Sequence, residues 1–270
     1  MKKNYVAFLI VSCIVISMFI IPVEDSASAY KRKDKYSWQI LRARRWLKKL
    51  WNREVKLISE TINLKGSFWL HSDNYIAYEA LEDSYPEFAR RLYQSLMNYG
   101  YQHDSWYELA FEGNLEVFPF QKGEAIVLVE GEWYQVKSWD YSSGEVFDDF
   151  EGYADLCMLK SIHSWIQGEC EDSLYYFEKA ESYWDGTGFK DGSWTNCYDT
   201  YKLGLFIATC KIVEYKSNLE EIIEKTIWSL QDIKSGGIWS HFSNIGEHWE
   251  GSQQTVEATA MCILAYKQPF

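Results

Sequence analysis

The fold is decided by the stretch Tyr183–Thr209, which reads YWDGTGFKDGSWTNCYDTYKLGLFIAT. It begins as a glycine-rich, aromatic loop that contains Trp194 and continues into a predicted helix with Asp199 in its first turn. The body of this helix is apolar and carries small residues at Gly204 and Ala208. A helix that is apolar all round is expected to be buried all round. The stretch therefore predicts an inner helix that begins with an acid.

Two other stretches repeat this order of a tryptophan loop, an acid and a helix of small residues. In the first, Trp69 and Asp73 lead into NYIAYEAL, and in the second, Trp239 and Glu257 lead into ATAMCILAY. The spacing between the copies is irregular, so the repeat rests on the order of its features rather than on a fixed period. Repeated units of this kind predict helical hairpins that close into a ring.

The beginning of the chain has the features of a targeting segment, assigned to residues 1–29. Two lysines precede an apolar run over residues 5–23, and Ala27-Ser28-Ala29 supplies the small residues of a signal-peptidase site. The alternative is a retained membrane anchor, because a run of roughly 18 apolar residues is at the lower limit for spanning a bilayer. Either way, we expect residues 30–270 to work outside the cytoplasm, as a secreted or membrane-anchored protein.

The composition limits the class of partner. The formal net charge is −12, which argues against binding to the phosphates of nucleic acid. Aromatic residues make up 17% of the chain and include 13 Trp and 20 Tyr. Such rings suit stacking on the flat faces of sugars, but they also fill the space between helices of small residues. A mature chain of this length can bury one core, so we expect residues 30–270 to form a single domain.

About eight helices of two alternating kinds are predicted. Charged amphipathic helices begin near Ser37, Pro86, Glu171 and Leu219, and small-residue helices begin near Ser72, Phe150, Tyr198 and Thr255. The first is expected to extend from Ser37 to about Thr61. The stretch over about residues 112–139 is β-branched and aromatic, which predicts an inserted β-hairpin or small sheet. The predicted fold is mainly α, an incomplete α/α toroid of about four helical hairpins with an inserted β-hairpin.

The chain resembles the α/α-toroid proteins, which include six-hairpin glycosidases and terpenoid-cyclase-like folds. More narrowly, four of its segments resemble secreted archaeal proteins of that fold whose function is uncharacterised: WDGTGFKD, YDTYKLGLFIA, SDNYIAYEAL and YADLCMLKSI. The resemblance covers most of residues 30–270. It implies a ring of helices and, by analogy with the glycosidases, two catalytic carboxylates in the central cavity. A full barrel of that kind has six hairpins, whereas about four are predicted here.

Four acids lie in or near the first turns of the predicted inner helices: Asp73, Asp155, Asp199 and Glu257. If these helices run parallel, their N-termini and the four carboxyl groups meet at one mouth of the ring. A pair of these groups can then act as general acid and as base or nucleophile on a glycosidic bond. We expect Asp199 and Glu257 to be that pair, with Asp73 as the next candidate. The alternative is structural, because a first-turn acid also satisfies free backbone N–H groups and complements the helix dipole.

Aromatic and histidine side chains are the candidate substrate-binding groups. Four tryptophans precede a predicted inner helix or lie in the central loop, which is the glycine-rich loop at the start of Tyr183–Thr209: Trp69, Trp184, Trp194 and Trp239. They suit a stacking platform for a polysaccharide, with structural plugs between hairpins as the alternative for two of the four. His71 and His241 each follow a loop tryptophan, so they are candidates for substrate binding or proton transfer. Their alternative role is hydrogen bonding at the surface.

No metal or other cofactor is expected, because zinc-type Cys/His spacing is absent and the segment Asp185–Asp191 resembles a calcium loop only weakly, without the acidic third position and downstream Glu of an EF-hand. The sequence also lacks a phosphate-binding glycine loop, GxSxG and HExxH, so nucleotide-dependent, esterase and zinc-protease functions have no support. The five cysteines after residue 29 are interpreted as small buried residues, with a disulfide as an alternative for some. The expected function is binding of a carbohydrate polymer, with glycoside cleavage as its extension. The alternative is a non-catalytic surface or structural protein. Terpenoid-type chemistry would require an aspartate-rich motif that the sequence lacks.

Overall fold

The computed structural model describes residues 35–63, 68–102 and 105–267. The segment predicted as signal peptide or anchor, with its apolar run over residues 5–23, lies outside these ranges. Within them, no helix is both long enough and apolar enough to cross a membrane. The residues from Trp38 onward form one compact unit, and the candidate site lies within it.

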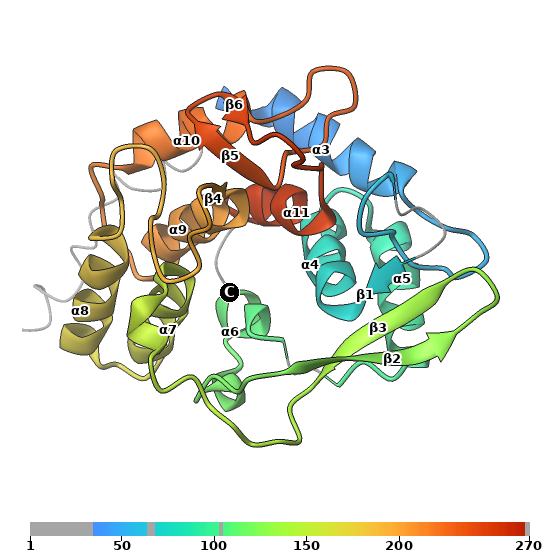
Figure 1. Ribbon diagram of the computed structural model, residues 1–270, viewed down its shortest axis with the longest axis horizontal. Coiled ribbons are helices and arrows are strands. Elements are labelled where there is room, and N and C mark those ends of the chain that lie inside the picture. The colour runs from blue at the N-terminus through green and yellow to red at the C-terminus, as the bar shows by residue number, and fades with distance from the viewer. Residues whose placement is uncertain (1–34, 64–67, 103–104, 268–270) are drawn as a thin grey trace, which may run out of the picture. The chain divides into compact units, whose positions relative to one another are not determined.

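Nine α-helices are described in these ranges (Figure 1). They are α3 (Ser37–Lys49), α4 (His71–Glu82), α5 (Pro86–Asn98), α6 (Tyr107–Glu112), α7 (Ala154–Ile166), α8 (Cys170–Glu181), α9 (Thr200–Ile212), α10 (Glu220–Ser229) and α11 (Val256–Leu264). Single 3-10 turns occur at Leu115–Val117 and Phe150–Gly152. The mainly α class expected from the sequence agrees with this content.

The helices differ in how much of their surface is buried. In α9 every residue except Tyr201 and Lys211 is buried, and in α11 every residue except Glu257 is buried. By contrast, α5 buries one stripe, formed by Ala89, Leu92, Ser95 and Leu96, and leaves its other side to solvent. This is the difference expected between helices covered on all sides and helices that cover them. Helices α5, α8 and α10 pack against α4, α7 and α9 respectively.

The more buried helices form a continuous series. Helix α4 packs against α11, α11 against α9, and α9 against α7 (Figure 1). The short helix α6 contacts α4, α7 and α9. Small residues allow the close approach within this series, because a Cβ on Gly204 of α9 would lie 2.8 Å from the backbone carbonyl of Met261 in α11. The small residue in the body of α9 thus lies at a helix–helix contact, where a larger one would overlap the neighbouring backbone.

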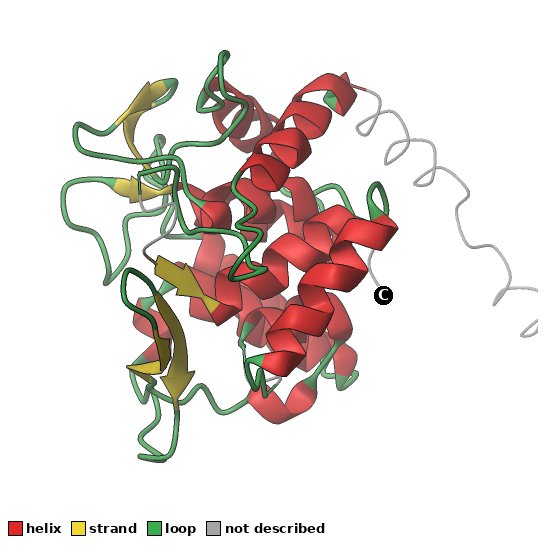
Figure 2. Cartoon of the chain, turned by 90° about the vertical axis from the view of Figure 1, so that its right-hand side faces the viewer, coloured by secondary structure: helices red, strands yellow, loops and turns green. Residues whose placement is uncertain are grey.

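The strands form two three-stranded sheets. One has the order β1-β3-β2, from Phe68–Leu70, Gln135–Asp140 and Glu124–Glu130, with β1 parallel and β2 antiparallel to β3. The other has the order β4-β5-β6, from Tyr198–Asp199, His241–Asn244 and Glu247–His248, and its pairs are antiparallel. Figure 2 shows both sheets on the same side of the helices.

Several boundaries differ from the sequence prediction. The first helix ends at Lys49 instead of near Thr61, because the Asn52 side chain accepts hydrogen bonds from the backbone of Glu54 and Val55 and forms a turn. The β region expected over residues 112–139 contains the β2–β3 hairpin, but it begins with a 3-10 turn rather than a strand. Helix α6 and the β4-β5-β6 sheet were not predicted. Both of these elements contribute to the site.

Candidate active site

Two of the acid-bearing helices begin where a strand ends. Strand β1 leads directly into α4, and β4 leads directly into α9, so both helices start at the side of the molecule that carries the sheets. Helix α11 starts next to isolated bridges between Thr61 and Thr255 and between Trp239 and Gln254. The start of α7 is tied to the central loop by a hydrogen bond from Gly192 N to Gly152 O. Strand pairing and loop contacts thus position the four helix starts.

The four predicted acids belong to one electrostatic cluster. Negative charge on Asp73, Asp199 and Asp155 raises the pKa of Glu257, which shows that all three act on the same carboxyl group. Their positions explain this coupling, since Asp73, Asp155 and Glu257 lie in the first turns of their helices and Asp199 directly precedes α9. We call these four residues the acid cluster.

Glu257 is held by a tyrosine from the unpredicted helix α6. The Tyr107 hydroxyl donates a hydrogen bond of 2.6 Å to Glu257 Oε1. Burial and the neighbouring charge of Asp73 raise the pKa of Glu257 from its ordinary value of 4.5 to about 8, against the opposing effect of the Tyr107 bond. Glu257 is the one residue of α11 that is not buried. A carboxyl group that keeps its proton at neutral pH suits a general acid.

Asp199 has the opposite environment. Lys202 Nζ lies 3.1 Å from its Oδ2, the Ser193 hydroxyl donates to the same oxygen over 3.1 Å, and His241 Nε2 lies 3.3 Å from its Oδ1. Burial alone would raise the pKa of Asp199, but the contacts with His241 and Lys202 outweigh it and lower the pKa below its ordinary value. The side chain is 23% exposed. Asp199 is therefore an ionised carboxylate with access to solvent.

The cation that holds Asp199 is part of a buried network. Lys202 has a 1% exposed side chain, and its Nζ lies 2.7 Å from Asp191 Oδ2 and 2.6 Å from Ser193 Oγ. Asp191 is fully buried and also accepts the backbone N–H of Ala154 at the start of α7 over 2.8 Å. The pKa of Lys202 is raised, because the charges of Asp155, Asp199 and Asp191 together outweigh its burial. One buried ammonium group thus links the start of α7 to Asp199.

Asp155 is coupled to this network by charge, since Lys202, Asp191 and Asp199 all act on its carboxyl group. Its Oδ2 accepts a 2.7 Å hydrogen bond from the Tyr201 hydroxyl. Burial raises the pKa of Asp155, and this effect is larger than the lowering by the Lys202 charge. Asp155 was not among the acids preferred for catalysis, and its bond to Tyr201 and the effect of the Lys202 charge on it agree with a supporting role.

Asp73, the third predicted catalytic acid, is enclosed. Its side chain is 3% exposed and accepts a 3.3 Å hydrogen bond from Ser72 Oγ. Burial and the charge of Glu60 raise the pKa of Asp73 well above its ordinary range, and a hydrogen bond between the two carboxyl groups favours the proton on Asp73. Asp73 and Glu60 are thus a buried acid pair that shares a proton. Asp73 therefore influences the pKa of Glu257, and its burial keeps it from contacting a substrate.

The acids of the cluster are not turned back on their own helices. Among the described hydrogen bonds, none of the four accepts from a backbone N–H of the helix that it heads. Helix α11 is capped by Thr255, whose hydroxyl accepts from Ala258 N, and the first N–H of α7 goes to Asp191. In α7 and α11, the capping role that sequence alone could not exclude is therefore filled by other groups.

The four tryptophans named from the sequence lie in different environments. Trp69 is fully buried and contacts Trp133 and Tyr134 edge-on, so the prediction that it stacks on substrate is wrong; it fills the space beneath the hairpin. Trp184 is half-buried with its ring centre 5.5 Å from that of Phe189.

The remaining two tryptophans are also half-buried. Trp194 lies beneath Lys190, whose Nζ is 4.2 Å from the ring centre. Trp239 stacks on His248 with ring centres 4.0 Å apart and planes 9° apart. Trp239 lies two residues before His241 in an extended segment, and His241 contacts Asp199. Trp194 directly follows Ser193, which also contacts Asp199, so Trp194 and Trp239 are both tied to the acid cluster through a neighbouring residue.

The two histidines also differ. His71 is 1% exposed, lies between the rings of Tyr99 and Tyr101, and has its pKa lowered to about 4 by burial. Both the substrate-binding role predicted for His71 and its surface alternative are therefore wrong, because it is a neutral core residue. His241, by contrast, is 42% exposed and contacts Asp199, so it belongs to the site.

His241 also connects Asp199 to a serine. Ser240 Oγ lies 2.7 Å from His241 Nδ1, opposite the Nε2 that faces Asp199. This order of groups occurs in serine hydrolases, which also need N–H donors for an oxyanion. Here the backbone N–H of Ser240 is bonded to Gln253 O and that of His241 to Ser252 Oγ. The geometry therefore favours a chain that orients His241 over one that activates Ser240.

The described residues contain no group of three or more His, Cys, Asp or Glu side chains arranged to hold a metal ion. Of the described cysteines, Cys157, Cys210 and Cys262 are buried, Cys197 is half-buried and Cys170 is exposed. No known protein family, curated protein or solved structure matches this chain.

Proposed function

We propose that this protein works outside the cytoplasm, binds a carbohydrate polymer and hydrolyses its glycosidic bonds, with Glu257 as the general acid and Asp199 as the base or nucleophile. We further propose that its helices form an incomplete α/α toroid. The series α4, α11, α9 and α7, with α6 in contact with three of its members, supports this architecture. The extracytoplasmic location rests on the apolar run over residues 5–23 and the small residues that follow it.

The proposal rests mainly on the contrast between two carboxyl groups of one cluster. Asp199 contacts Lys202 and His241, which favour its charge, whereas Glu257 accepts a hydrogen bond from the Tyr107 hydroxyl and experiences the negative charge of three other acids. Their pKa values move in opposite directions from similar ordinary values. Two carboxyl groups whose pKa values are shifted in opposite directions can serve as the acid and the base of glycoside hydrolysis.

The chemical step follows from these protonation states. Glu257 donates its proton to the glycosidic oxygen as the bond to the anomeric carbon breaks, so that the leaving sugar departs as an alcohol. Asp199 either attacks the anomeric carbon or removes a proton from the water that does so. In both cases water supplies the new hydroxyl group. Lys202 and Ser193 keep Asp199 ionised and fixed in position, and Tyr107 orients Glu257.

The experiment is reducing-end release from a panel of polysaccharides by the purified protein and its variants. Glu257→Gln and Asp199→Asn each preserve side-chain shape and should reduce the rate by about 100- to 10,000-fold. The matched control is Asp172→Asn, because Asp172 is also a first-turn acid but is exposed on α8, away from the cluster. Circular dichroism checks that all variants are folded. Full activity in Glu257→Gln would remove Glu257 from the mechanism.

Two other outcomes identify the alternatives. A folded parent that releases no reducing ends from any polysaccharide would support the non-catalytic surface protein. Ser240→Ala should retain hydrolysis of the polysaccharide, since Ser240 acts only through His241. Release of p-nitrophenol from its acetate ester that disappears in Ser240→Ala, without any glycoside hydrolysis, would instead support a serine hydrolase.

A further inference from the structure

Helix α3 differs in charge from the rest of the molecule. Its cations are Arg42, Arg44, Arg45, Lys48 and Lys49, and it contains no acid. The whole chain, by contrast, has a formal net charge of −12. A solvated helix usually mixes charges of both signs, because opposite charges three or four positions apart stabilise it. The positive charge of α3 therefore indicates a partner outside the helix.

The outer face of α3 is held in place by its inner face. The buried residues of the helix are Ile40, Ala43, Trp46 and Leu47. Trp38, Arg45 and Lys49 are exposed, and their spacings of seven and four positions place them in one row along the helix. Lysines in the last turn also complement the helix dipole, but Arg45 lies before that turn. The row is thus a fixed surface feature that the stability of the helix does not explain.

A turn that follows α10 extends this face. Gln231 Nε2 donates a 2.8 Å hydrogen bond to Gln39 O of α3. Arg42 Nη2 donates to Asp232 O over 3.2 Å. The Asp232 carboxylate accepts two backbone N–H groups of its own turn, which fixes the shape of the turn. Ile233, the next residue, is 82% exposed. The turn therefore holds an apolar side chain in solvent beside α3.

Apolar and cationic groups thus occur together on one surface. Ile233 and Trp38, which is 60% exposed, are the two most exposed large apolar side chains in the described part of the chain. Arg42, which contacts the turn, lies one helical turn after Trp38. Figure 1 shows α3 and α10 along one edge of the compact unit and β2 at the opposite edge. We call the exposed group the α3 patch, which consists of Trp38, Arg45, Lys49, Ile233 and Lys234.

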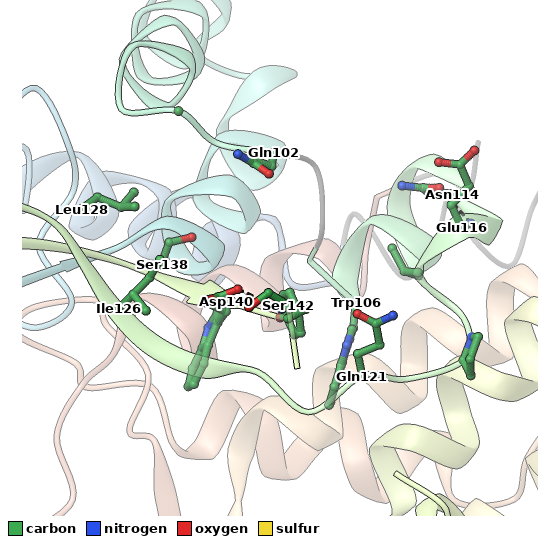
Figure 3. Close-up of a pocket in the computed structure, with 15 residues that line it drawn as sticks. Gln102, Trp106, Asn114, Glu116, Gln121, Ile126, Leu128, Ser138, Asp140 and Ser142 are labelled. Carbon is green, nitrogen blue, oxygen red and sulfur yellow. Dashed lines mark hydrogen bonds between the residues drawn. The ribbon is translucent and has the colours of Figure 1, made fainter. Parts of the chain in front are cut away.

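A hollow elsewhere on the molecule has the opposite charge. It lies between the β2–β3 hairpin and the segment around α6, has a volume of about 640 Å³ and is lined in part by Ile126, Ser138 and Trp106 (Figure 3). We call it the hairpin cavity. Its charged lining residues are Glu116 and Asp140, and its lining contains no lysine, arginine or histidine. An anionic partner would meet only negative charge there, so the α3 patch is the surface suited to it.

We infer that the α3 patch binds the surface of an anionic lipid bilayer. Its cations contact the lipid phosphates, and Trp38 and Ile233 enter the boundary between headgroups and acyl chains. A soluble polyanion would use the cations alone and leave the two apolar side chains in water. The sequence agrees with a lipid partner, because the basic residues 31–33 precede α3 and the apolar run over residues 5–23 precedes them. The inference goes beyond the proposed function and does not depend on it.

Vesicle flotation with residues 30–270 tests the inference. This chain contains every core residue of the described structure and lacks the apolar run over residues 5–23, which would bind lipid by itself. Phosphatidylcholine vesicles with about 30% phosphatidylglycerol should bind it at least about tenfold more tightly than pure phosphatidylcholine vesicles. The difference should shrink as salt rises from about 0.1 M to about 0.5 M, because salt screens the charges.

Variants separate the ionic and apolar parts of the binding. Arg45→Gln should weaken binding to anionic vesicles by about fivefold and reduce its dependence on salt. Trp38→Ala and Ile233→Ser should weaken binding by a similar factor at both salt concentrations, because they remove apolar contact rather than charge. Lys122→Gln removes the same charge from an exposed ion pair in the segment that leads into β2, so it is the control and should leave binding unchanged. Circular dichroism checks that all variants are folded.

Several outcomes would overturn the inference. These are equal binding to neutral and anionic vesicles, no binding to either, and equal losses in Arg45→Gln and Lys122→Gln. Binding to soluble polygalacturonate without binding to anionic vesicles would assign the patch to an anionic polymer and would also overturn it. None of these measurements uses glycoside hydrolysis, so failure of the membrane inference and failure of the proposed function are distinguishable.

Discussion

The acid cluster and the α3 patch are built in opposite ways. In the cluster, the charged groups lie at helix starts, and the ionised carboxylate is held by three side chains, those of Lys202, Ser193 and His241. In the patch, the cations and two apolar side chains are exposed on the outer side of one helix and on the turn beside it. Reactive groups need fixed positions and defined protonation, whereas binding groups need access. The acid cluster is therefore suited to chemistry and the α3 patch to recognition.

The same contrast extends to stability. Charges in the cluster are buried together, so each one depends on its neighbours, and removal of one leaves another uncompensated. Side chains in the α3 patch face solvent and support less of the core. We therefore expect substitutions in the cluster to change both folding and activity, and substitutions in the patch to change membrane binding alone.

The largest effect is expected for Lys202→Met. This change keeps the approximate side-chain length but removes the ammonium group that contacts Asp191 and Asp199. A buried ion pair that loses one partner typically costs about 3–5 kcal/mol, because the remaining charge is desolvated. Urea unfolding should show this loss of unfolding free energy. Lys225→Met, at an exposed ion pair with Glu221 on α10, is the control and should cost less than about 1 kcal/mol. Equal effects of the two changes would contradict the buried network.

The second prediction concerns pH. The pKa of Glu257 is about 8 in the folded protein and near its ordinary 4.5 when unfolded. Between these values the folded state holds a proton that the unfolded state has lost. The contribution of Glu257 to stability is therefore complete below pH 4.5 and declines as pH rises toward 8, by up to about 1.4 kcal/mol per pH unit. Hydrolysis should also decline above pH 8, as Glu257 loses the proton it donates.

The Glu257→Gln variant isolates this effect. Glutamine does not ionise, so the variant should gain unfolding free energy relative to the parent as pH rises from about 5 to 8, while remaining inactive. Chemical denaturation at several pH values measures the difference. Glu250→Gln, at an exposed position, should track the parent. A constant difference between the Glu257 variant and the parent across this range would show that Glu257 ionises normally and is unsuited to act as the acid.

Much of the acid cluster was predictable because local pattern determines it. An acid in the first turn of an apolar helix is visible in sequence, and the charge of Asp199 acts on Glu257 in the folded chain. Sequence did not show that Asp73 would be enclosed with Glu60, because Glu60 precedes it by 13 positions and lies outside any helix. Lys202 was overlooked, although a lysine within a wholly apolar helix was a usable signal.

The hairpin cavity was not predictable in the same way. Its strands were expected from their β-branched residues, but the opposite wall comes from Gln102, Trp106 and the segment around the unpredicted helix α6. That helix has only six residues, which is too short for a periodic pattern to reveal. His71 and Trp69 were misplaced for a related reason. Burial of these two side chains depends on Tyr99, Tyr101, and the hairpin, which approach from other parts of the chain.

The third prediction tests the helix contact beneath the cluster. Gly204→Ala would place a Cβ 2.8 Å from the Met261 carbonyl, so α9 and α11 must separate. Overpacking of this kind costs about 1–3 kcal/mol. Thermal unfolding should show the loss. Gly152→Ala is the control, because a Cβ there meets nothing within 4 Å, and its φ is not positive. An unchanged midpoint for Gly204→Ala would mean that the two helices have room to move apart, and that the position of Glu257 on α11 is less fixed than the structure indicates.

The smallest effect on stability is expected in the α3 patch. Trp38 and Trp46 belong to the same helix, yet Trp38 is 60% exposed and Trp46 is 1% exposed. Trp38→Ala should lower the unfolding free energy by less than about 1 kcal/mol, whereas Trp46→Ala should lower it by about 3–5 kcal/mol. Urea unfolding of the two variants, beside flotation with anionic vesicles, gives both readouts. A Trp38 variant that is severely destabilised would place this ring in the core and contradict its role at the membrane. Retained stability with weakened vesicle binding would instead assign the exposed ring to the lipid surface, and would divide the tryptophans of α3 between core filling and membrane contact as their burial suggests.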